Sequence, residues 1–310
     1  MGQSCLRRSA LLLAILAGGA KCSGKSERAP VVGGSVADFA LASGSIWWTK
    51  LDDGWLYQTP ISGGSAVRVM PGGFVAAAQN VVVAVDGAAA STLWSVDPAG
   101  GSPRPVATTP FDGYDSVATL AVDASRAYVV VTKTAVPDAI YAVNLSGQGA
   151  PTFLATAIDA AAMASDGTTV FWTESRPGFV KSVPAKGGPT TVIASAQMNA
   201  AAIVVDDSAI YWAVSEAIIA VAKGGGSPTP LVSTPSNPNA QALAVDASNL
   251  YWVAAGPQGS LMKVPKGGGT PTVVVPSTSF AISIAVDDVN VYWLEFPPES
   301  PANSVFSARK

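Results

Sequence analysis

The 310-residue sequence contains no histidine, only two cysteines, and few charged residues, which make up 13% of the chain. Without histidine it has no Ser-His-Asp or Cys-His catalytic group, no imidazole metal ligand and no histidine pH switch. The formal net charge of −3 offers no basic excess for phosphates, so we expect no nucleic-acid partner. The hydrophobic content of 49% excludes a disordered chain, because disorder requires few apolar residues and many charges.

The first residues carry the pattern of an export signal. Arg7 and Arg8 precede an apolar run from Ala10 to Ala20, and a basic start, an apolar stretch of this length and small residues are typical of a secretory signal peptide. The run is shorter than the roughly 20 apolar residues that span a bilayer. The expected organisation therefore has three parts: a signal peptide (1–21), a flexible tail (22–28) and one folded domain (29–310).

Cys22 would be the only cysteine left after the signal is removed, so it could form no internal disulfide. An unpaired cysteine in an exported protein calls for an explanation. A small-residue segment followed by cysteine resembles the bacterial lipoprotein signal, which implies acylation of Cys22 and a lipid-anchored protein of the periplasm or outer membrane. The open alternative is a free thiol in the tail of a secreted protein.

One sequence unit recurs along the chain, as in LAVDASNLYW ending at Trp252 and IAVDDVNVYW ending at Trp293. Self-similarity at a fixed period indicates a repeat architecture. The anchor position of the unit, usually aspartate, recurs every 35 to 46 residues, at Ala42, Ala77, Asp123, Asp166, Asp206, Asp246 and Asp287. A second phrase with a glycine turn follows most anchors, for example VPKGGGTPTVVV from Val264.

Each unit reads as four short strands, because Val, Ile, Tyr and Trp favour strands and Gly/Pro/Asp/Ser clusters mark the turns. A period of about 40 residues with four strands is that of a β-propeller blade. The sequence thus predicts an all-β propeller of seven four-stranded antiparallel blades, with six blades as the alternative. The seventh unit lacks its fourth strand, and the segment Ala29–Gly34 belongs to no unit, so we expect this N-terminal strand to close the last blade.

The repeat resembles the YWTD-type propeller pattern, and more loosely the TolB-like and NHL propellers. The residues that carry the resemblance are the anchor aspartates and four aromatic pairs, Phe171-Trp172, Tyr211-Trp212, Tyr251-Trp252 and Tyr292-Trp293. Threonine follows the aromatic pair only at Thr49 and Thr173, and the final aspartate of YWTD is absent. The glycine turns combined with Tyr-Trp strands also resemble exported bacterial repeat proteins, and the resemblance implies fold rather than activity.

The repeated residues are interpreted as structural. A tryptophan present once per blade is expected to pack between sheets, and an aspartate before a turn to accept backbone N–H bonds. The glycine runs lead into proline and a strand rather than a helix, so they are not phosphate loops. The pairs Asp206-Asp207 and Asp287-Asp288 lack the spacing of a calcium loop; hence we predict no metal site and no cofactor, with Ca²⁺ as the only ion considered.

The loops outside the repeat are rich in acids, including Asp86, Asp138, Asp159, Glu216, Glu295 and Glu299, and are expected on one face of the ring. Exposed aromatic residues beside acidic ones suit a cationic or polar partner. The predicted ligand-binding residues are Asp52, Asp53, Trp55, Phe111, Asp112, Tyr114, Asp115 and Glu174. The alternative is that these charges serve solubility.

Two functions follow from these patterns. The first is a non-catalytic binding or scaffold propeller of the bacterial cell envelope, whose acidic loop face holds a protein, peptide or glycan. The second is a carboxylate- or metal-dependent hydrolase, such as a lactonase-like propeller. Against the second, the first strands of the units are apolar, as in ALAV, AIVV and ISIAV, and no pair of acids forms a catalytic motif. No catalytic residue is predicted.

Overall fold

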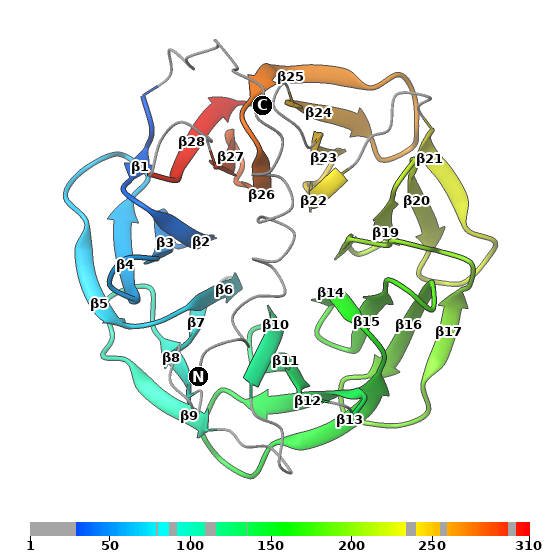
Figure 1. The fold of residues 1–310 in the computed structure, drawn as a ribbon, viewed down its shortest axis with the longest axis horizontal. Coiled ribbons are helices and arrows are strands. Elements are labelled where there is room, and N and C mark those ends of the chain that lie inside the picture. The colour runs from blue at the N-terminus through cyan, green and yellow to red at the C-terminus, as the bar shows by residue number, and fades with distance from the viewer. Residues whose placement is uncertain are drawn as a thin grey trace.

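The computed structural model describes residues 29–78, 80–86, 92–108, 116–134, 136–233, 240–254, 259–296 and 302–310. Their strands form seven four-stranded antiparallel sheets arranged as blades around an axis (Figure 1). The chain is a seven-bladed β-propeller, so the predicted fold is confirmed and the six-bladed alternative is wrong. None of the described segments forms a helix of the length and apolarity needed to cross a bilayer.

Each of blades 1 to 6 is a meander whose first strand lies innermost and whose fourth lies at the rim (Figure 1). The strands of blades 1 to 3 are β2 (Val36–Ala42), β3 (Ser45–Lys50), β4 (Trp55–Pro60) and β5 (Val67–Pro71); β6 (Phe74–Ala78), β7 (Val81–Val85), β8 (Thr92–Val96) and β9 (Arg104–Thr108); and β10 (Ser116–Val122), β11 (Arg126–Thr132), β12 (Asp138–Asn144) and β13 (Thr152–Ala157).

The strands of blades 4 to 6 are β14 (Ala160–Ser165), β15 (Thr169–Glu174), β16 (Phe179–Pro184) and β17 (Thr191–Ala194); β18 (Ala202–Val205), β19 (Ala209–Val214), β20 (Ala217–Ala222) and β21 (Thr229–Ser233); and β22 (Ala240–Val245), β23 (Asn249–Ala254), β24 (Gly259–Pro265) and β25 (Thr272–Thr278). Blade 7 contains β26 (Ala281–Val286), β27 (Asn290–Glu295), β28 (Ser304–Arg309) and, outermost, β1 (Val32–Gly33).

The two ends of the ring meet in blade 7. Strand β1 pairs antiparallel with β28, with Val32 opposite Val305, and the N–H of Val31 donates to the carbonyl of Val305 at 2.8 Å. Beside this pair, Asn303 and Val36 exchange two hydrogen bonds of 3.2 Å between blades 7 and 1. The predicted closure by the N-terminal strand is therefore confirmed.

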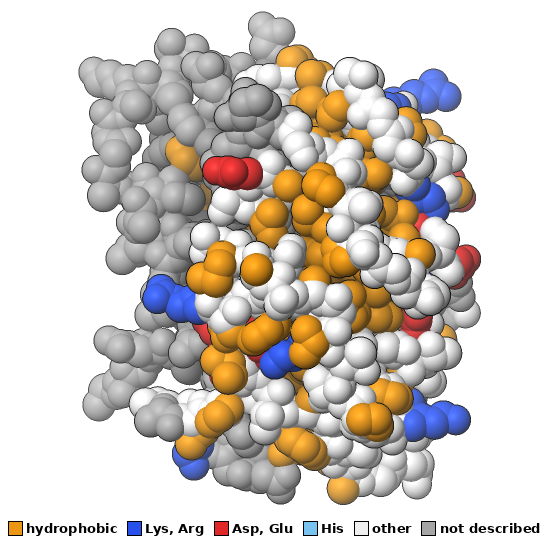
Figure 2. All heavy atoms as spheres, turned by 90° about the vertical axis from the view of Figure 1, so that its right-hand side faces the viewer, with side chains coloured by type: hydrophobic (Ala, Val, Ile, Leu, Met, Phe, Trp, Pro, Cys, Tyr) orange, Lys and Arg blue, Asp and Glu red, His pale blue; other side chains and the backbone are white. Residues whose placement is uncertain are grey.

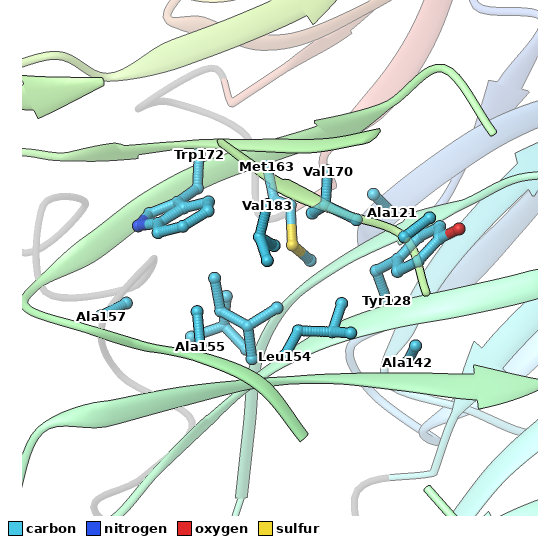
Figure 3. Packing of buried hydrophobic residues seen from close by; sticks show 13 residues of the cluster. Ala121, Tyr128, Ala142, Leu154, Ala155, Ala157, Met163, Val170, Trp172 and Val183 are labelled. Atoms are coloured by element: carbon cyan, nitrogen blue, oxygen red, sulfur yellow. The ribbon is translucent and has the colours of Figure 1, made fainter. Parts of the chain in front are cut away.

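The hydrophobic core consists of seven clusters, one at each contact between neighbouring blades. Because side chains alternate along a strand and both faces of a blade are covered, the second strands are apolar on both sides. In β15, Trp172 packs toward blade 3 while Phe171 packs toward blade 5. Figure 3 shows the first of these contacts, with Met163 lying between Trp172 and Tyr128.

The repeated tryptophans are structural, as expected. Trp172, Trp212 and Trp293 are fully buried, and Trp48 and Trp252 are nearly so. A buried indole N–H needs an acceptor, and nearby side chains supply it over 2.6–3.1 Å in four blades: Thr59 to Trp48, Glu174 to Trp172, Gln197 to Trp212 and Glu295 to Trp293.

The anchor aspartates stabilise the turn between the first two strands. In each case one carboxylate oxygen accepts two backbone N–H groups, as Asp206 does from Ser208 and Ala209 at 2.7 and 2.8 Å. In blade 2 the strand register places Ala78 rather than Ala77 at the anchor position. The predicted anchor in blade 2 is therefore wrong by one residue, because the three consecutive alanines do not distinguish one position from the next.

Candidate functional site

The connections between strands lie on two faces of the ring. The loop face contains the connections from second to third strands and from blade to blade; the turn face contains those from first to second and from third to fourth strands. Neighbouring loops are linked, for example by the N–H of Ser175 and the carbonyl of Asp159 at 3.2 Å. Figure 2 looks onto the rim between the two faces.

The structure separates the predicted ligand-binding residues. Asp52 and Asp53 are exposed in the loop before β4, and Trp55 is the half-buried first residue of that strand, all in blade 1. Glu174 ends β15 in blade 4, on the opposite side of the ring (Figure 1). These four residues therefore do not form one site. The other predicted residues lie outside the described part of the chain: Phe111, Asp112, Tyr114 and Asp115.

In blade 1 the polar groups bond to one another. The N–H of Trp55 donates to one carboxylate oxygen of Asp53 at 3.0 Å, and the hydroxyl of Tyr57 donates to the other at 2.6 Å. This second bond lowers the pKa of Asp53 and raises the pKa of Tyr57. The guanidinium of Arg68 lies 3.4 Å from the centre of the Trp55 ring. Trp55, predicted as an exposed loop aromatic, is thus a strand residue covered by a cation.

Glu174 is fully buried, so its predicted place in an exposed loop is wrong. One carboxylate oxygen accepts the indole N–H of Trp172 at 3.1 Å and the backbone N–H of Ile158 at 3.2 Å. The other oxygen lies 2.8 Å from the ammonium of Lys181. A buried carboxylate must be paired with a cation and hydrogen-bonded. Glu174 meets both conditions, so its role in the structure is to hold blade 4 together.

Two more acids assigned to the exposed loop face are buried. Glu295 is 2% exposed and accepts the indole N–H of Trp293 at 2.6 Å, while Asp138 is 6% exposed and accepts the backbone N–H of Ala160 in the next blade at 3.3 Å. The loop face is therefore less acidic than predicted. Its accessible charges, among the described residues, are Asp52, Asp53, Asp86, Asp159, Glu216, Lys50, Lys133 and Arg176.

Exposed apolar side chains on the loop face were not predicted as a site. Ile158 and Met198 are 55% and 53% exposed. They lie in two loops that bond, through the neighbouring Asp159 and Asn199, to Ser175 in the blade 4 loop that carries Arg176. The Arg176 guanidinium, 89% exposed, is 3.9 Å from the carboxylate of Asp159. We call Ile158, Asp159, Arg176 and Met198 the blade-4 patch. The sequence does not predict this patch, because each loop contributes a single apolar residue and no sequence pattern indicates that these loops lie next to one another.

Backbone hydrogen bonds fix the loops of the blade-4 patch. Ser175 donates its N–H to the carbonyl of Asp159 and accepts the N–H of Asn199, at 3.2 and 2.9 Å. Gln197 donates its N–H to Gly178 at 2.8 Å, and its side chain accepts the indole N–H of Trp212 at 2.8 Å. Three loops distant in sequence are thus held as one surface.

A cavity of about 330 Å³ lies between the inner strands β26, β2, β6 and β10. In blades 1, 3 and 7, the first-strand residue that pairs with the position directly after the tryptophan position of the second strand is polar. These residues are Asp38, Thr119 and Ser283, and strand register therefore places them at the same level of the central channel. All three line the cavity. The other blades present apolar side chains at this level: Phe74, Ala162, Ala202 and Ala242.

On the turn face, lysines of one blade pair with anchor aspartates of the preceding blade. The contacts are Lys223 with Asp166, Lys266 with Asp206 at 2.7 Å, and Lys310 with Asp246 at 2.7 Å.

These ion pairs change the titration of the aspartates. Burial alone would raise the pKa of Asp166 and of Asp206, but the lysine and the turn N–H groups outweigh it and lower each pKa to about 2. Burial and the hydrogen bond to Asp246 raise the pKa of Tyr251 to about 12. The aspartates are therefore ionised at neutral pH and hold blades 4 to 7 together.

No group of three or more Cys, Asp and Glu side chains in the described ranges is placed to hold a metal ion. No protein-family model matches the sequence. No curated protein matches it either.

Solved propeller structures resemble the chain at low sequence identity. A chain of the mitotic checkpoint complex aligns with a TM-score of 0.69 and 10% identity, over 94% of this chain and 96% of that one. A chain of the nidogen/laminin complex, a YWTD-type propeller, aligns with a TM-score of 0.50 and 20% identity, over 67% and 82%. A puromycin-hydrolysing peptidase of Mycobacterium tuberculosis aligns with a TM-score of 0.65 and 15% identity, over 88% of this chain and 51% of that one. At these identities the likeness shows the fold alone.

Proposed function

We propose that the protein is a non-catalytic binding propeller of the cell envelope and that its loop face holds a protein partner. The observation that carries this proposal is the blade-4 patch, where two apolar side chains more than half exposed flank an exposed arginine and aspartate. Protein interfaces combine an apolar centre with polar groups and are enriched in arginine and methionine.

The backbone of the blade-4 patch supports the same proposal. Its three loops are tied by the bonds of Ser175, Gln197 and Asn199, so little conformational entropy is lost when a partner docks. The remaining large exposed apolar side chains of the described chain are more dispersed. Leu51 and Val136 also lie on the loop face, Val289 lies on the turn face, and one lies on the outer strand of each of four blades: Val67, Phe153, Val192 and Val273.

The location in the envelope rests on the sequence. The basic and apolar start of the chain supports export, and Cys22 supports a lipid anchor in the periplasm or outer membrane. Two complexes among the similar structures, nidogen/laminin and the mitotic checkpoint complex, are named for protein–protein assembly, which agrees with a protein partner.

Photo-crosslinking in the native host tests the proposal. A photoreactive amino acid replaces Met198 in the blade-4 patch, and in a matched control it replaces Val273, which is 55% exposed at the rim. The proposal predicts a discrete crosslinked protein from position 198 that position 273 does not give. Equal products from both positions, or none from position 198, would overturn it.

A further inference from the structure

We infer that Arg68, held against Trp55 at the rim of blade 1, binds a carboxylate from an acidic side chain of a protein partner. The site comprises Asp53, Trp55, Tyr57 and Arg68, which we call the blade-1 cluster. The inference rests on the proposed function for the class of partner only, because the blade-1 cluster and the blade-4 patch are separate surfaces.

The aromatic and cationic side chains of the blade-1 cluster lie on one face of the blade. Trp55 and Tyr57 are two positions apart on β4, and Arg68 on β5 is the register partner of Tyr57, so all three side chains point the same way. The guanidinium of Arg68 lies 3.4 Å from the centre of the Trp55 ring. This distance is that of a cation–π contact, which positions the guanidinium.

The donors of the positioned guanidinium are free. The carboxylate of Asp53 does not pair with it, because the two Asp53 oxygens accept the N–H of Trp55 at 3.0 Å and the hydroxyl of Tyr57 at 2.6 Å. Within the described part of the chain, Arg68 forms no ion pair and its side chain donates no hydrogen bond. A guanidinium carries five N–H donors in a fork that fits both oxygens of a carboxylate.

The surroundings of the guanidinium are rigid. In the loop before β4, the N–H of Gly54 donates to the carbonyl of Lys50 at 2.9 Å, and the carbonyl of Gly54 accepts the N–H of Gly72 at 2.8 Å. The rings of Trp48 and Tyr57 stack with their centres 4.6 Å apart. Little conformational entropy is therefore lost when a ligand binds.

The local charge favours a carboxylate over a phosphate. The hydrogen bond from Tyr57 and the charges of Lys50 and Arg68 lower the pKa of Asp53, so this group is an anion beside the site. Asp52 in the same loop is exposed. Two cations next to two carboxylates give no excess positive charge to attract a dianion, and the geometry of the fork then decides the ligand.

The neighbouring residues favour a protein as the source of the carboxylate. Leu51 and Val67 are each 58% exposed; the first lies two residues before Asp53, and the second is adjacent to Arg68 in sequence. Tryptophan, tyrosine and arginine are the residues that most often dominate protein interfaces. The sequence predicted a cationic or polar ligand near Asp53 and Trp55, and the contacts of Asp53 reverse the sign.

NMR of the arginine Nε–H groups on the full chain tests the inference, with Nα-acetyl-glutamate methylamide as the probe. The Arg68 resonance should shift and saturate on titration to millimolar concentration. Arg309 is the internal control, since it is exposed and no ring in the described part of the chain stacks on it; its resonance should not saturate. The neutral analogue Nα-acetyl-glutamine methylamide should not shift either resonance.

Three variants separate the fork and the ring from charge alone. Arg68→Lys retains the cation but not the fork and should weaken binding by about fivefold or more. Trp55→Leu retains Arg68 without its ring and should weaken binding by about threefold. Lys133→Gln removes an exposed cation elsewhere on the loop face and should change the affinity less than twofold.

Equal saturation at Arg68 and Arg309, or wild-type affinity in Arg68→Lys, would overturn the site. Tighter binding of inorganic phosphate or of methyl glucuronide than of the glutamate probe would overturn the acidic side chain as its ligand. The outcome is separable from the proposed function. If the crosslink at position 198 is absent but the probe binds at Arg68, the carboxylate site stands and the blade-4 patch is wrong. If the crosslink forms but the probe does not bind, the reverse holds.

Discussion

The ammonium of Lys266 in blade 6 lies 2.7 Å from a carboxylate oxygen of Asp206 in blade 5. The same relationship joins Lys223 to Asp166 and Lys310 to Asp246, so the contacts between blades 4 and 5, 5 and 6, and 6 and 7 carry an ion pair.

At the turn face, the contacts between blades 1 and 2, 2 and 3, and 3 and 4 contain a hydrogen bond to a backbone carbonyl instead of an ion pair. There a side chain of one blade donates to the backbone carbonyl of the next: Gln58 to Pro98, Arg104 to Leu145 and Arg126 to Ala185. The ring is thus held at its turn face by two kinds of link.

Removing one ion pair should weaken the ring. Lys266→Met leaves Asp206 partly buried without its cation, and we expect the free energy of unfolding to fall by about 1–2 kcal/mol, between the values for exposed and buried pairs. Lys186→Met is the control, because Lys186 is exposed and forms no part of the link between blades. In its blade the position equivalent to Lys266 is Ala185, whose carbonyl accepts a hydrogen bond from Arg126. That control should change stability by less than about 0.5 kcal/mol. Urea melts measure both; equal losses would mean that the ion pair contributes nothing specific.

Stability should fall in acid because of the same aspartates. The pKa values of Asp166 and Asp206 are about 2 in the folded chain and about 3.9 in an unfolded one. A lowered folded pKa stabilises the fold above pH 4, and the contribution is lost as the pH falls toward 2. Urea midpoints from pH 6 to pH 2 should show this loss. Asp206→Asn should flatten the slope between pH 4 and pH 2, and a slope identical to the wild type would contradict the assignment.

The N-terminal strand should stabilise the closed ring. Deleting residues 22–28 leaves β1 in place and should not change stability, whereas deleting residues 22–34 removes β1 and should cost about 2–4 kcal/mol in hydrogen bonds and the burial of Val32. Because Val32 and Val305 are register partners, cysteines at both positions should form a disulfide. Two deletions that melt alike, together with no disulfide, would show that β1 does not close the ring.

Much of the fold could be predicted from the sequence because the structure repeats. The anchor aspartate, the aromatic pair and the glycine turn recur with the strands, so seven units gave seven blades. The unpaired third strand at Ser304–Arg309 even located the partner of β1. Blade 2 was the weakest unit, since it has neither the aspartate nor the aromatic pair, and there the anchor was misplaced by one residue.

The site could be predicted far less well, because it depends on contacts between units. Glu174 precedes a polar segment, so the sequence assigns it to a loop. In the structure it is the last residue of β15 and the buried acceptor of the indole N–H of Trp172. The three polar residues of the channel are 81 and 164 positions apart along the chain, and only strand register brings them to one level. The lysine–aspartate pairs are likewise formed between neighbouring units rather than within one.

The blade-4 patch should depend on Gly178. Its φ is +68°, and a Cβ there would lie 3.0 Å from the sulfur of Met198 and 3.1 Å from the nitrogen of Gln197. Gly178→Ala should therefore destabilise the protein by more than about 1 kcal/mol and displace Met198. Gly267→Ala is the control, since a Cβ there meets nothing within 4 Å. Thermal melts that show no difference between the two variants would contradict the described loop geometry.

Binding through the loop face of blade 4 is measured by the affinity of the crosslinked partner for surface variants. Isothermal titration would compare the wild type with Ile158→Asp/Met198→Asp on the blade-4 patch and with Val192→Asp/Val273→Asp at the rim, four positions that are 53–55% exposed. The patch variant should bind more than about tenfold more weakly than the wild type, as for residues at the centre of an interface. The rim variant should bind within twofold of the wild type. Retained affinity in the patch variant would contradict binding through the loop face of blade 4.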